Sequence, residues 1–234
     1  MAKERIAKFI SASGHCSRRA AERLIEERKV KVNGVVIDTP VTLVDASDEI
    51  EVEGKILSRI LEPKLWILHK PTGYICTRSD EQGRPTIYDL IPKDKHNLHY
   101  IGRLDMNSEG LLLLTDSPEV KNYYEHPNNK IARVYLVRVF GIVPKKMFEF
   151  AKKGIVIRDD ETGKNMVYNA LIEPYKAPED GSKNAWLKFT LREGKNKEIR
   201  RICEHFGLQV SKLKRISFGD FHLGSIPKGK MIEI

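Results

Sequence analysis

The chain has 234 residues, of which 41% are apolar, and its 41 Lys and Arg against 32 Asp and Glu give a formal charge of +9. No apolar run approaches the ~18 residues of a membrane span, and the charged opening residues lack the apolar stretch of a signal peptide. The three cysteines, Cys16, Cys76 and Cys203, are odd in number and far apart, which argues against a disulfide framework or a zinc site. We expect a cytoplasmic protein with one full core, a small second domain and a polyanionic partner.

The N-terminal residues carry most of the charge asymmetry. Residues 1–35 hold nine basic side chains against four acidic ones, whereas residues 36–62 hold two against seven. Ile6, Phe9 and Ile10 follow helical spacing, and Gly14 is placed to end that helix. A mildly basic surface alone is common among soluble proteins, but this distribution predicts that residues 1–35 form the end of an N-terminal module that faces the polyanion.

A second helix and a hairpin are predicted next. Ser17 is a suitable N-cap, and the narrow apolar stripe that follows it leaves Arg18, Arg19 and Arg23 facing outward. Asn33-Gly34, between two short β-branched runs, is a strong signal for a β-hairpin.

Beyond residues 55–64, where Glu62-Pro63 is the predicted linker, the pattern changes to alternating strands and helices, which predicts two domains, 1–60 and 61–234. The elements expected in chain order are a buried strand at 65–70 ending at Pro71, an apolar strand at 111–115, a short helix opened by Ser117-Pro118 and ending near His126, a central strand at 133–140, exposed loops at 159–165 and 177–184, and an amphipathic helix at 199–206 stopped by Gly207.

One carboxylate stands in a position suited to chemistry. Asp105 lies beside Arg103 in a loop bounded by Gly102 and Gly110, which runs directly into the apolar strand. A surface Asp in a turn would look the same if the short motif stood alone. The longer string of residues 102–115, GRLDMNSEGLLLLT, resembles the catalytic motif of the pseudouridine synthases that modify small- and large-subunit ribosomal RNA.

Three further segments resemble the same family. Residues 9–34 are similar to the S4 RNA-binding module, with a solvated basic helix pair as the alternative. Lys70-Pro71-x-Gly73 matches a second family motif, although a Pro after a strand is common on its own. Residues 193–201, EGKNKEIRR, match the motif in which a basic residue pairs with the catalytic carboxylate; alone, they would be interpreted as a solvated basic helix face.

The resemblance implies the roles of the site residues. Asp105 is expected to be the catalytic group, as nucleophile at C1′ or as base, and Arg200 to keep its carboxylate ionised and oriented. Tyr135 is expected to stack on the uracil, with a core tyrosine as the alternative. Arg103 is expected to fill the vacancy left by the flipped base or to bind a phosphate. The RNA-binding residues expected besides Arg103 are Lys70, Lys195 and Arg201 in the second domain and Arg5, Lys8, Arg18, Arg19 and Arg23 in the first.

The family implies an α+β fold: a small helical S4 module followed by a catalytic domain with a central, largely antiparallel sheet flanked by helices. No cofactor or metal is expected, because the chain has no phosphate-binding Gly-rich loop, no H-E-x-x-H and no histidine ligand spacing. The expected partner is ribosomal RNA with a loop or bulge uridine, and a monomer is expected.

The target RNA is suggested by two strings. Residues 76–86 and 211–220 look most like the large-subunit members of this branch. Glu198 stands where many relatives carry Gln, and Lys195 and Lys197 replace Arg, which loses bidentate phosphate geometry. Small-subunit or transfer RNA therefore stays open as substrate. A non-catalytic S4-type RNA-binding protein is the alternative from another class, and an RNA phosphodiesterase is a weaker one.

Overall fold

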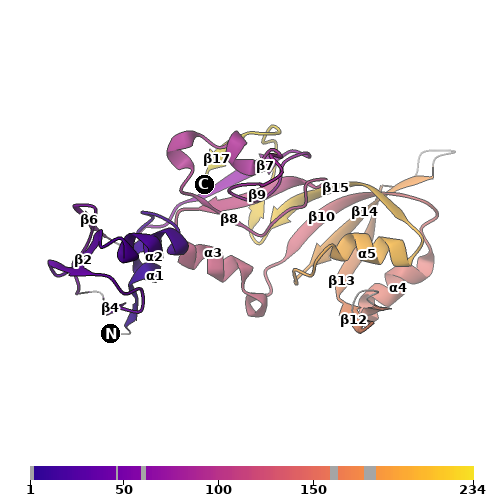
Figure 1. Ribbon diagram of the computed structural model, residues 1–234. Helices are drawn as coiled ribbons and strands as arrows, with labels where there is room; N and C mark the ends of the chain where they lie inside the picture. The colour runs from indigo at the N-terminus through magenta and orange to yellow at the C-terminus, as the bar shows by residue number, and fades with distance from the viewer. Residues whose placement is uncertain (1–2, 46, 59–61, 159–162, 177–182) are drawn as a thin grey trace.

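The computed structural model describes residues 3–45, 47–58, 62–158, 163–176 and 183–234 (Figure 1). The N-terminal module pairs α1 (Ile6–Ala12) and α2 (Arg18–Glu26) with a four-stranded sheet in the order β3-β2-β5-β6, and a separate two-stranded pair, β1-β4, lies beside it. The strand bounds are Glu4–Arg5 (β1), Val30–Val32 (β2), Val35–Ile37 (β3), Leu43–Val44 (β4), Ile50–Val52 (β5) and Lys55–Leu57 (β6).

The local signals of this module are confirmed. The Ser17 hydroxyl accepts from the Ala20 N–H at 3.2 Å, and Ala21 and Ile25 turn inward while the arginines of α2 are exposed. Asn33 and Gly34 both have positive φ, +50° and +81°, as the tight turn between β2 and β3 requires. Lys55–Leu57 is the edge strand β6 of this module and lies before the predicted boundary after residue 60, which stays a prediction.

The second domain is built on a nine-stranded sheet whose main path is β13-β14-β10-β15-β9-β7-β17, with β16 added to β15 and β8 to β9. All its pairings are antiparallel except β15 with β9, so the predicted sheet type is confirmed. The bounds are Leu65–Lys70 (β7), His99–Ile101 (β8), Glu109–Thr115 (β9), Arg133–Phe140 (β10), Ala170–Lys176 (β13), Asn184–Leu191 (β14), Gln209–Phe218 (β15), Phe221–His222 (β16) and Met231–Glu233 (β17).

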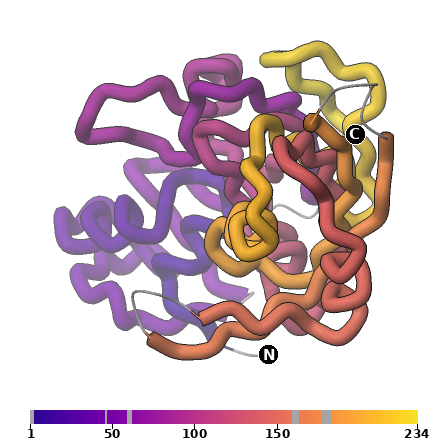
Figure 2. The backbone as a smooth tube through the Cα atoms, turned by 90° about the vertical axis from the view of Figure 1, so that its right-hand side faces the viewer, coloured from indigo at the N-terminus to yellow at the C-terminus, as the bar shows by residue number. Residues whose placement is uncertain are grey.

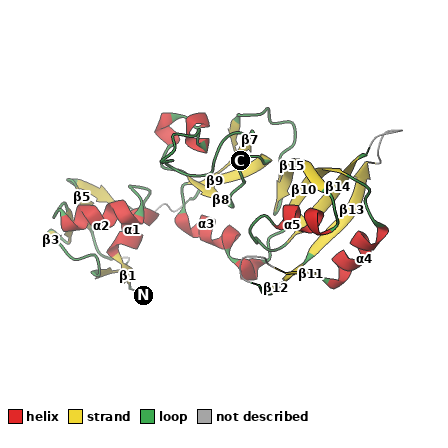
Figure 3. Cartoon of the chain, turned by 45° about the vertical axis from the view of Figure 1, so that its right-hand side comes forward, coloured by secondary structure: helices red, strands yellow, loops and turns green. Residues whose placement is uncertain are grey.

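Helices cover the two halves of this sheet separately. On the β13-β14-β10-β15 half, α4 (Lys145–Lys153) and α5 (Glu198–His205) pack against one face and share a core with β10 and β14 (Figure 3). On the other half, α3 (Pro118–Glu125) covers a smaller cluster around Ile101, Leu111 and Phe218. A two-stranded pair, β11 (Ile155–Arg158) and β12 (Asn165–Tyr168), completes the domain beside α5, and short 3-10 turns occupy Ile87–Leu90, Lys93–Lys95 and Pro127–Asn129.

Most predicted elements of this domain are confirmed. The strand at 133–140 has the expected bounds and lies between two partners, and Ser117 caps α3 by accepting from the Val120 N–H at 3.3 Å. Most of the loops predicted at 159–165 and 177–184 lie outside the described residues. In the view turned by 90° the N-terminal module lies on the far side of the molecule from β12 and β13 (Figure 2).

Candidate active site

Asp105 projects from the loop between β8 and β9 into two adjoining cavities, of about 440 Å³ and about 880 Å³. Its residue is exposed, and its carbonyl closes a tight turn by accepting from the Ser108 N–H at 3.0 Å. Among the residues that the structure describes, none donates a hydrogen bond to the Asp105 carboxylate. The carboxylate is therefore open to a substrate on both sides of the loop.

Lys70, the last residue of β7, is buried beneath this loop and binds its backbone. Its side chain is 0% exposed, and its ammonium donates to the carbonyls of Pro71, Asp105 and Ser108 at 3.1, 3.0 and 2.8 Å. Burial lowers the pKa of Lys70 to about 8, and the nearby Cys76 and Asp105 oppose that shift. The prediction that Lys70 contacts RNA is thus corrected, because its buried ammonium binds the backbone carbonyls of the loop that carries Asp105.

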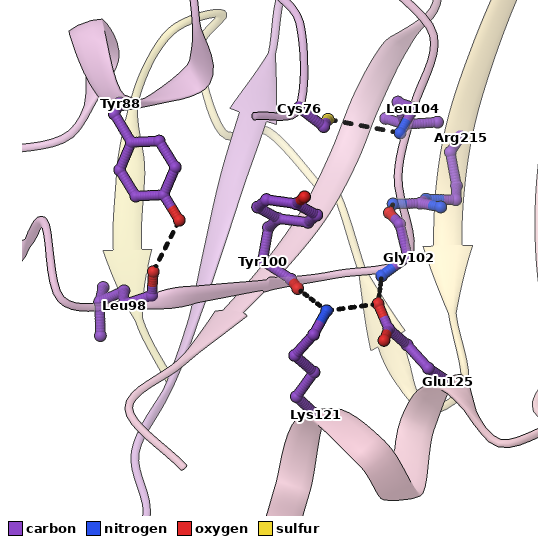
Figure 4. Close-up of polar contacts among 9 residues, drawn as sticks. All are labelled: Cys76, Tyr88, Leu98, Tyr100, Gly102, Leu104, Lys121, Glu125 and Arg215. Atoms are coloured by element: carbon purple, nitrogen blue, oxygen red, sulfur yellow. Dashed lines mark hydrogen bonds and ion pairs between the residues drawn. The ribbon is translucent and has the colours of Figure 1, made fainter. Parts of the chain in front are cut away.

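Two side chains hold the start of the loop at Gly102 (Figure 4). Glu125 accepts from the Gly102 N–H at 2.8 Å, and Arg215 donates to the Gly102 carbonyl at 2.9 Å. Lys121 fixes Glu125 at 2.7 Å, four residues along α3, and also donates to the Tyr100 carbonyl at 2.7 Å. Arg215 is 1% exposed and reaches Leu111 O at 2.7 Å, so one buried guanidinium ties β15 to the loop and to β9.

Gly110 lets the two halves of the sheet meet beside the site. The parallel contact between β9 and β15 consists of Glu109 with Lys214 and Gly110 with Arg215. A Cβ on Gly110 would lie 2.2 Å from the Arg215 carbonyl oxygen and 2.7 Å from its nitrogen, and φ is +116°. Only glycine permits this approach of two backbones, which brings the Asp105 loop next to β10 and β15.

Tyr135 reaches the smaller cavity from β10. Its ring is 8% exposed and lies on the same face as Val137 and Val139, and the register of β10 against β15 shifts between Val134 and Tyr135. The extra residue at this bulge is Ile216 of β15, opposite Val134 and Tyr135. Tyr135 thus belongs to the core and also lines the cavity, so the two alternatives for this residue are compatible.

Arg200, on α5, lines both cavities that Asp105 lines. Its guanidinium donates to the Asn107 carbonyl at 3.4 Å, and among the described residues no ion pair within 4.0 Å joins it to Asp105. The structure brings the two residues to one site, and their pairing stays a prediction. The contact with Asn107 places Arg200 against the loop that carries Asp105.

The other basic residues predicted in this domain differ in their surroundings. Arg103 is exposed and lines both cavities. Lys195 is engaged inside the protein, because its ammonium contacts the Glu193 carboxylate at 2.6 Å, the Val167 carbonyl and, at 5.3 Å, the Tyr168 ring. Arg201 donates to the Tyr168 hydroxyl at 3.3 Å. Arg103 suits a phosphate best, whereas Lys195 is bound to Glu193 before α5 and Arg201 links α5 to β12.

Several residues of the site had no assigned role in the sequence analysis. Lys121, Arg133, Lys197 and Arg215 bring the basic residues that line the smaller cavity to seven, against four acidic ones. Burial lowers the pKa of Arg133, whose guanidinium lies 4.8 Å from the Phe218 ring and donates to the Glu193 carbonyl at 3.0 Å. The excess of positive charge suits a polyanion.

The predicted RNA-binding residues of the N-terminal module are all exposed. Arg5 lies on β1, Lys8 on α1, and Arg18, Arg19 and Arg23 on α2. Lys8 forms an ion pair at 3.1 Å with Glu4 of β1, so part of its charge is matched within the module. Whether these residues bind RNA stays a prediction.

No group of three His, Cys, Asp or Glu side chains in the described part of the chain is arranged to hold a metal ion. Within the same residues, no helix is long and apolar enough to cross a membrane.

Two family models match the chain. Residues 64–205 match the RNA pseudouridylate synthase family, and residues 4–50 match the S4 domain. The first match contains Asp105, Tyr135 and Arg200, and the second contains the basic residues of α1 and α2.

Individual proteins resemble the chain over nearly its whole length. A Rickettsia felis protein named as an uncharacterized RNA pseudouridine synthase is 42% identical over 234 residues, covering 99% of this chain and 96% of the relative. Ribosomal large subunit pseudouridine synthase B of Bacillus subtilis is 35% identical, covering 99% and 92%. A crystal structure of a pseudouridylate synthase superposes with a TM-score of 0.68 at 27% identity, covering 98% and 95%.

Proposed function

The chain belongs to the RNA pseudouridine synthase family, and from this premise we propose that it converts uridine to pseudouridine at one or a few sites of large-subunit ribosomal RNA, with Asp105 as the catalytic residue. The observation that carries the proposal is the position of Asp105: an exposed carboxylate on a rigidly held loop, shared by two cavities that Arg200 also lines. Tyr135 approaches the smaller cavity from a different strand.

The reaction defines what these groups must do. The bond from C1′ to N1 breaks, the uracil turns over, C1′ joins C5, and the proton on C5 leaves while N1 gains one. The Asp105 carboxylate can attack C1′ or remove a proton from the sugar, and an arginine nearby favours its ionised form. The Tyr135 ring offers a face against which uracil can stack, and a cavity of about 440 Å³ lies within the range of small-ligand sites.

The target base must leave its stack before it reaches Asp105. Unstacking costs a few kcal/mol and is cheapest in a loop or bulge, so we propose a uridine of that kind. Arg103, exposed and without a partner among the described residues, is placed to enter the vacancy or to bind a flanking phosphate. The exposed basic residues of the S4 domain supply affinity through the RNA backbone.

The choice of large-subunit RNA rests on the relatives. The Bacillus subtilis protein and the chain are similar across both domains, and that relative is named for the large ribosomal subunit. Pseudouridines should be mapped in ribosomal RNA from cells with and without this protein. If the position that disappears lies in small-subunit or transfer RNA, the proposed target is wrong and the reaction stands. We further propose that the protein works in the cytoplasm as a monomer, without cofactor.

Asp105→Asn tests the catalytic assignment. The amide is isosteric and cannot serve as nucleophile or base, so pseudouridine formation should fall to background while RNA affinity changes by a few-fold at most. Asp220→Asn, in the exposed turn between β15 and β16, is the matched control and should keep full activity. Turnover above background in the Asp105 variant would exclude it as the catalytic group.

A further inference from the structure

A buried carboxyl group without a donor lies in the wall of the active-site cavity. Glu198, the first residue of α5, lines the smaller cavity and is 3% exposed. Neither of its oxygens has a hydrogen-bond partner. A buried carboxylate is normally bound by several donors, so an ionised Glu198 would be costly at this position.

Its neighbour Glu193 has the opposite surroundings. One Glu193 oxygen accepts from the Asn169 N–H at 2.9 Å and the other from the Lys195 ammonium at 2.6 Å. Burial raises the pKa of Glu193, but these two donors outweigh it and hold the pKa below its usual value. Burial, and after it the adjacent Glu193 carboxylate, raise the pKa of Glu198 to about 8. The Lys195 ammonium and backbone N–H oppose this shift with smaller effects. Two neighbouring carboxyl groups cannot both be ionised cheaply, and Glu198, which is more weakly stabilised as an anion than Glu193, keeps the proton.

The other charged groups around this pair are already engaged. Arg133 from β10 donates to the Glu193 carbonyl, and Arg215 from β15 donates to Gly102 and Leu111. Lys214, also on β15, lies 3.9 Å from Glu109. β11, which packs against α5, carries one charged residue, Arg158, at its exposed end. The N-terminus of α5 itself favours a negative charge and therefore acts against the effects of burial and Glu193.

We propose that Glu198 is a positioning residue that works as a neutral carboxylic acid, donating its proton to Glu193 and thereby fixing the segment 193–200 that carries Arg200 beside the Asp105 loop. The segment contains Lys197 in a left-handed conformation, with φ of +50°, as the N-cap of α5. If Glu198 lost its proton to solvent, two buried carboxylates would lie side by side and repel each other. This repulsion would shift the start of α5. Arg200, which lies in the first turn of α5, would move with it.

The inference rests on the proposed function for its kinetic test, in which single-turnover pseudouridine formation is measured from pH 6 to 9.5. Glu198→Gln keeps an N–H that can donate to Glu193 and cannot ionise. We expect its rate at pH 7 to lie within about twofold of the native rate. Because about a tenth of a group with a pKa near 8 stays protonated at pH 9, the ratio of the native rate to the rate of the Glu198→Gln variant should fall about tenfold between pH 7 and pH 9.

The ratio isolates Glu198 from other groups. Lys70, whose pKa is also about 8, titrates in both proteins and cancels in the ratio. RNA affinity measured at each pH, and circular dichroism at pH 9, separate a change in the chemical step from weaker binding or unfolding. A ratio that stays constant across the range, or a Glu198→Gln protein that is inactive at pH 7 although folded, would overturn the proposal.

A second measurement does not depend on activity. Infrared difference spectroscopy of the full chain should show a protonated-carboxyl C=O band at pH 7 that disappears near pH 8 and is missing from the Glu198→Gln variant. If neither protein forms pseudouridine but the band titrates as expected, the proposed function fails and the neutral state of Glu198 stands. A native protein without that band refutes the neutral acid whatever its activity.

Discussion

Lys70→Met tests whether a buried ammonium holds the loop that carries Asp105. The substitution keeps the length of the side chain and removes its charge. Holding Lys70 with a pKa near 8 instead of 10.5 corresponds to about 3 kcal/mol of unfavourable burial at pH 7, which the Met variant recovers. Against this, three carbonyls, of Pro71, Asp105 and Ser108, lose their donor at about 1–3 kcal/mol each. With about 2 kcal/mol for each carbonyl, the net destabilisation is about 3 kcal/mol.

Thermal melting and single-turnover pseudouridine formation measure the two consequences. A loss of about 3 kcal/mol corresponds to a melting temperature lower by roughly 6–12 °C in a domain of this size, and the rate should fall by at least about tenfold because a loosened turn misplaces Asp105. Lys64→Met is the matched control: Lys64 is exposed, pairs with Glu233 at 2.7 Å and should change stability by less than about 1 kcal/mol. A Lys70→Met protein with native rate and native melting temperature would refute the reasoning.

The stability difference between the native protein and Lys70→Met should also change with pH in a defined direction. The folded pKa of Lys70 is lower than the unfolded value, so the penalty of burying its charge is complete below about pH 8 and disappears as the pH rises to 10.5. The native protein should therefore gain stability relative to Lys70→Met across that window, as measured by denaturant unfolding. A constant difference between the two proteins would show that Lys70 is not a buried ammonium.

Three further predictions concern the junction, the acid pair and the RNA surface. Gly110→Ala should destabilise by more than about 4 kcal/mol or prevent folding, because the new methyl group meets the Arg215 backbone at 2.2 Å, whereas Gly224→Ala, with no atom within 4 Å, should cost only about 1 kcal/mol in chemical unfolding. Glu198→Gln should gain stability relative to the native protein progressively from pH 4.5 to about 8, by up to roughly 5 kcal/mol, since the native folded protein keeps a proton there that its unfolded chain releases; a stability difference between the two proteins that is equal at pH 5 and pH 8 would contradict this. The third change replaces the exposed arginines of α2, Arg18, Arg19 and Arg23, by Gln. The slope of the logarithm of the RNA-binding constant against the logarithm of the salt concentration should become shallower by roughly 0.7–0.9 for each phosphate that the helix no longer neutralises. An unchanged slope would mean that this helix does not face RNA.

Elements with a strong local signal could be predicted from the sequence. The Asn33-Gly34 turn, the Ser17 and Ser117 caps and the β-branched run at 133–140 were each determined by neighbouring residues, and each is found where it was expected. Strands β5 and β6 were not predicted, because each is only three residues long and includes a charged residue, Glu51 in β5 and Lys55 in β6. Short edge strands depend on their partners more than on their own sequence.

The buried charges of the site could not be predicted in the same way. A lysine or arginine in a single sequence is interpreted as exposed, since such residues are rarely buried without partners. Lys70 and Arg215 are buried because backbone carbonyls far away in the chain, at Asp105, Ser108, Gly102 and Leu111, accept from them. Only the fold brings those acceptors together, so the sequence could not show that Lys70 is buried beneath the Asp105 loop and is not exposed to RNA.

The position of the site explains why one motif carried so much of the prediction. Asp105 lies between β8 and β9 in one half of the sheet, whereas Tyr135 and Arg200 come from β10 and α5 in the other half. The halves meet through two residue pairs of parallel strand, and that contact requires glycine at position 110. The string of residues 102–115 therefore contains both the carboxylate that we propose as catalytic and the glycine at the junction of the two halves. A substitution that separates the two halves of the sheet should abolish activity although Asp105, Tyr135 and Arg200 are all unchanged. A family motif alone would not predict this loss, because it records the residues and not the contact between the halves.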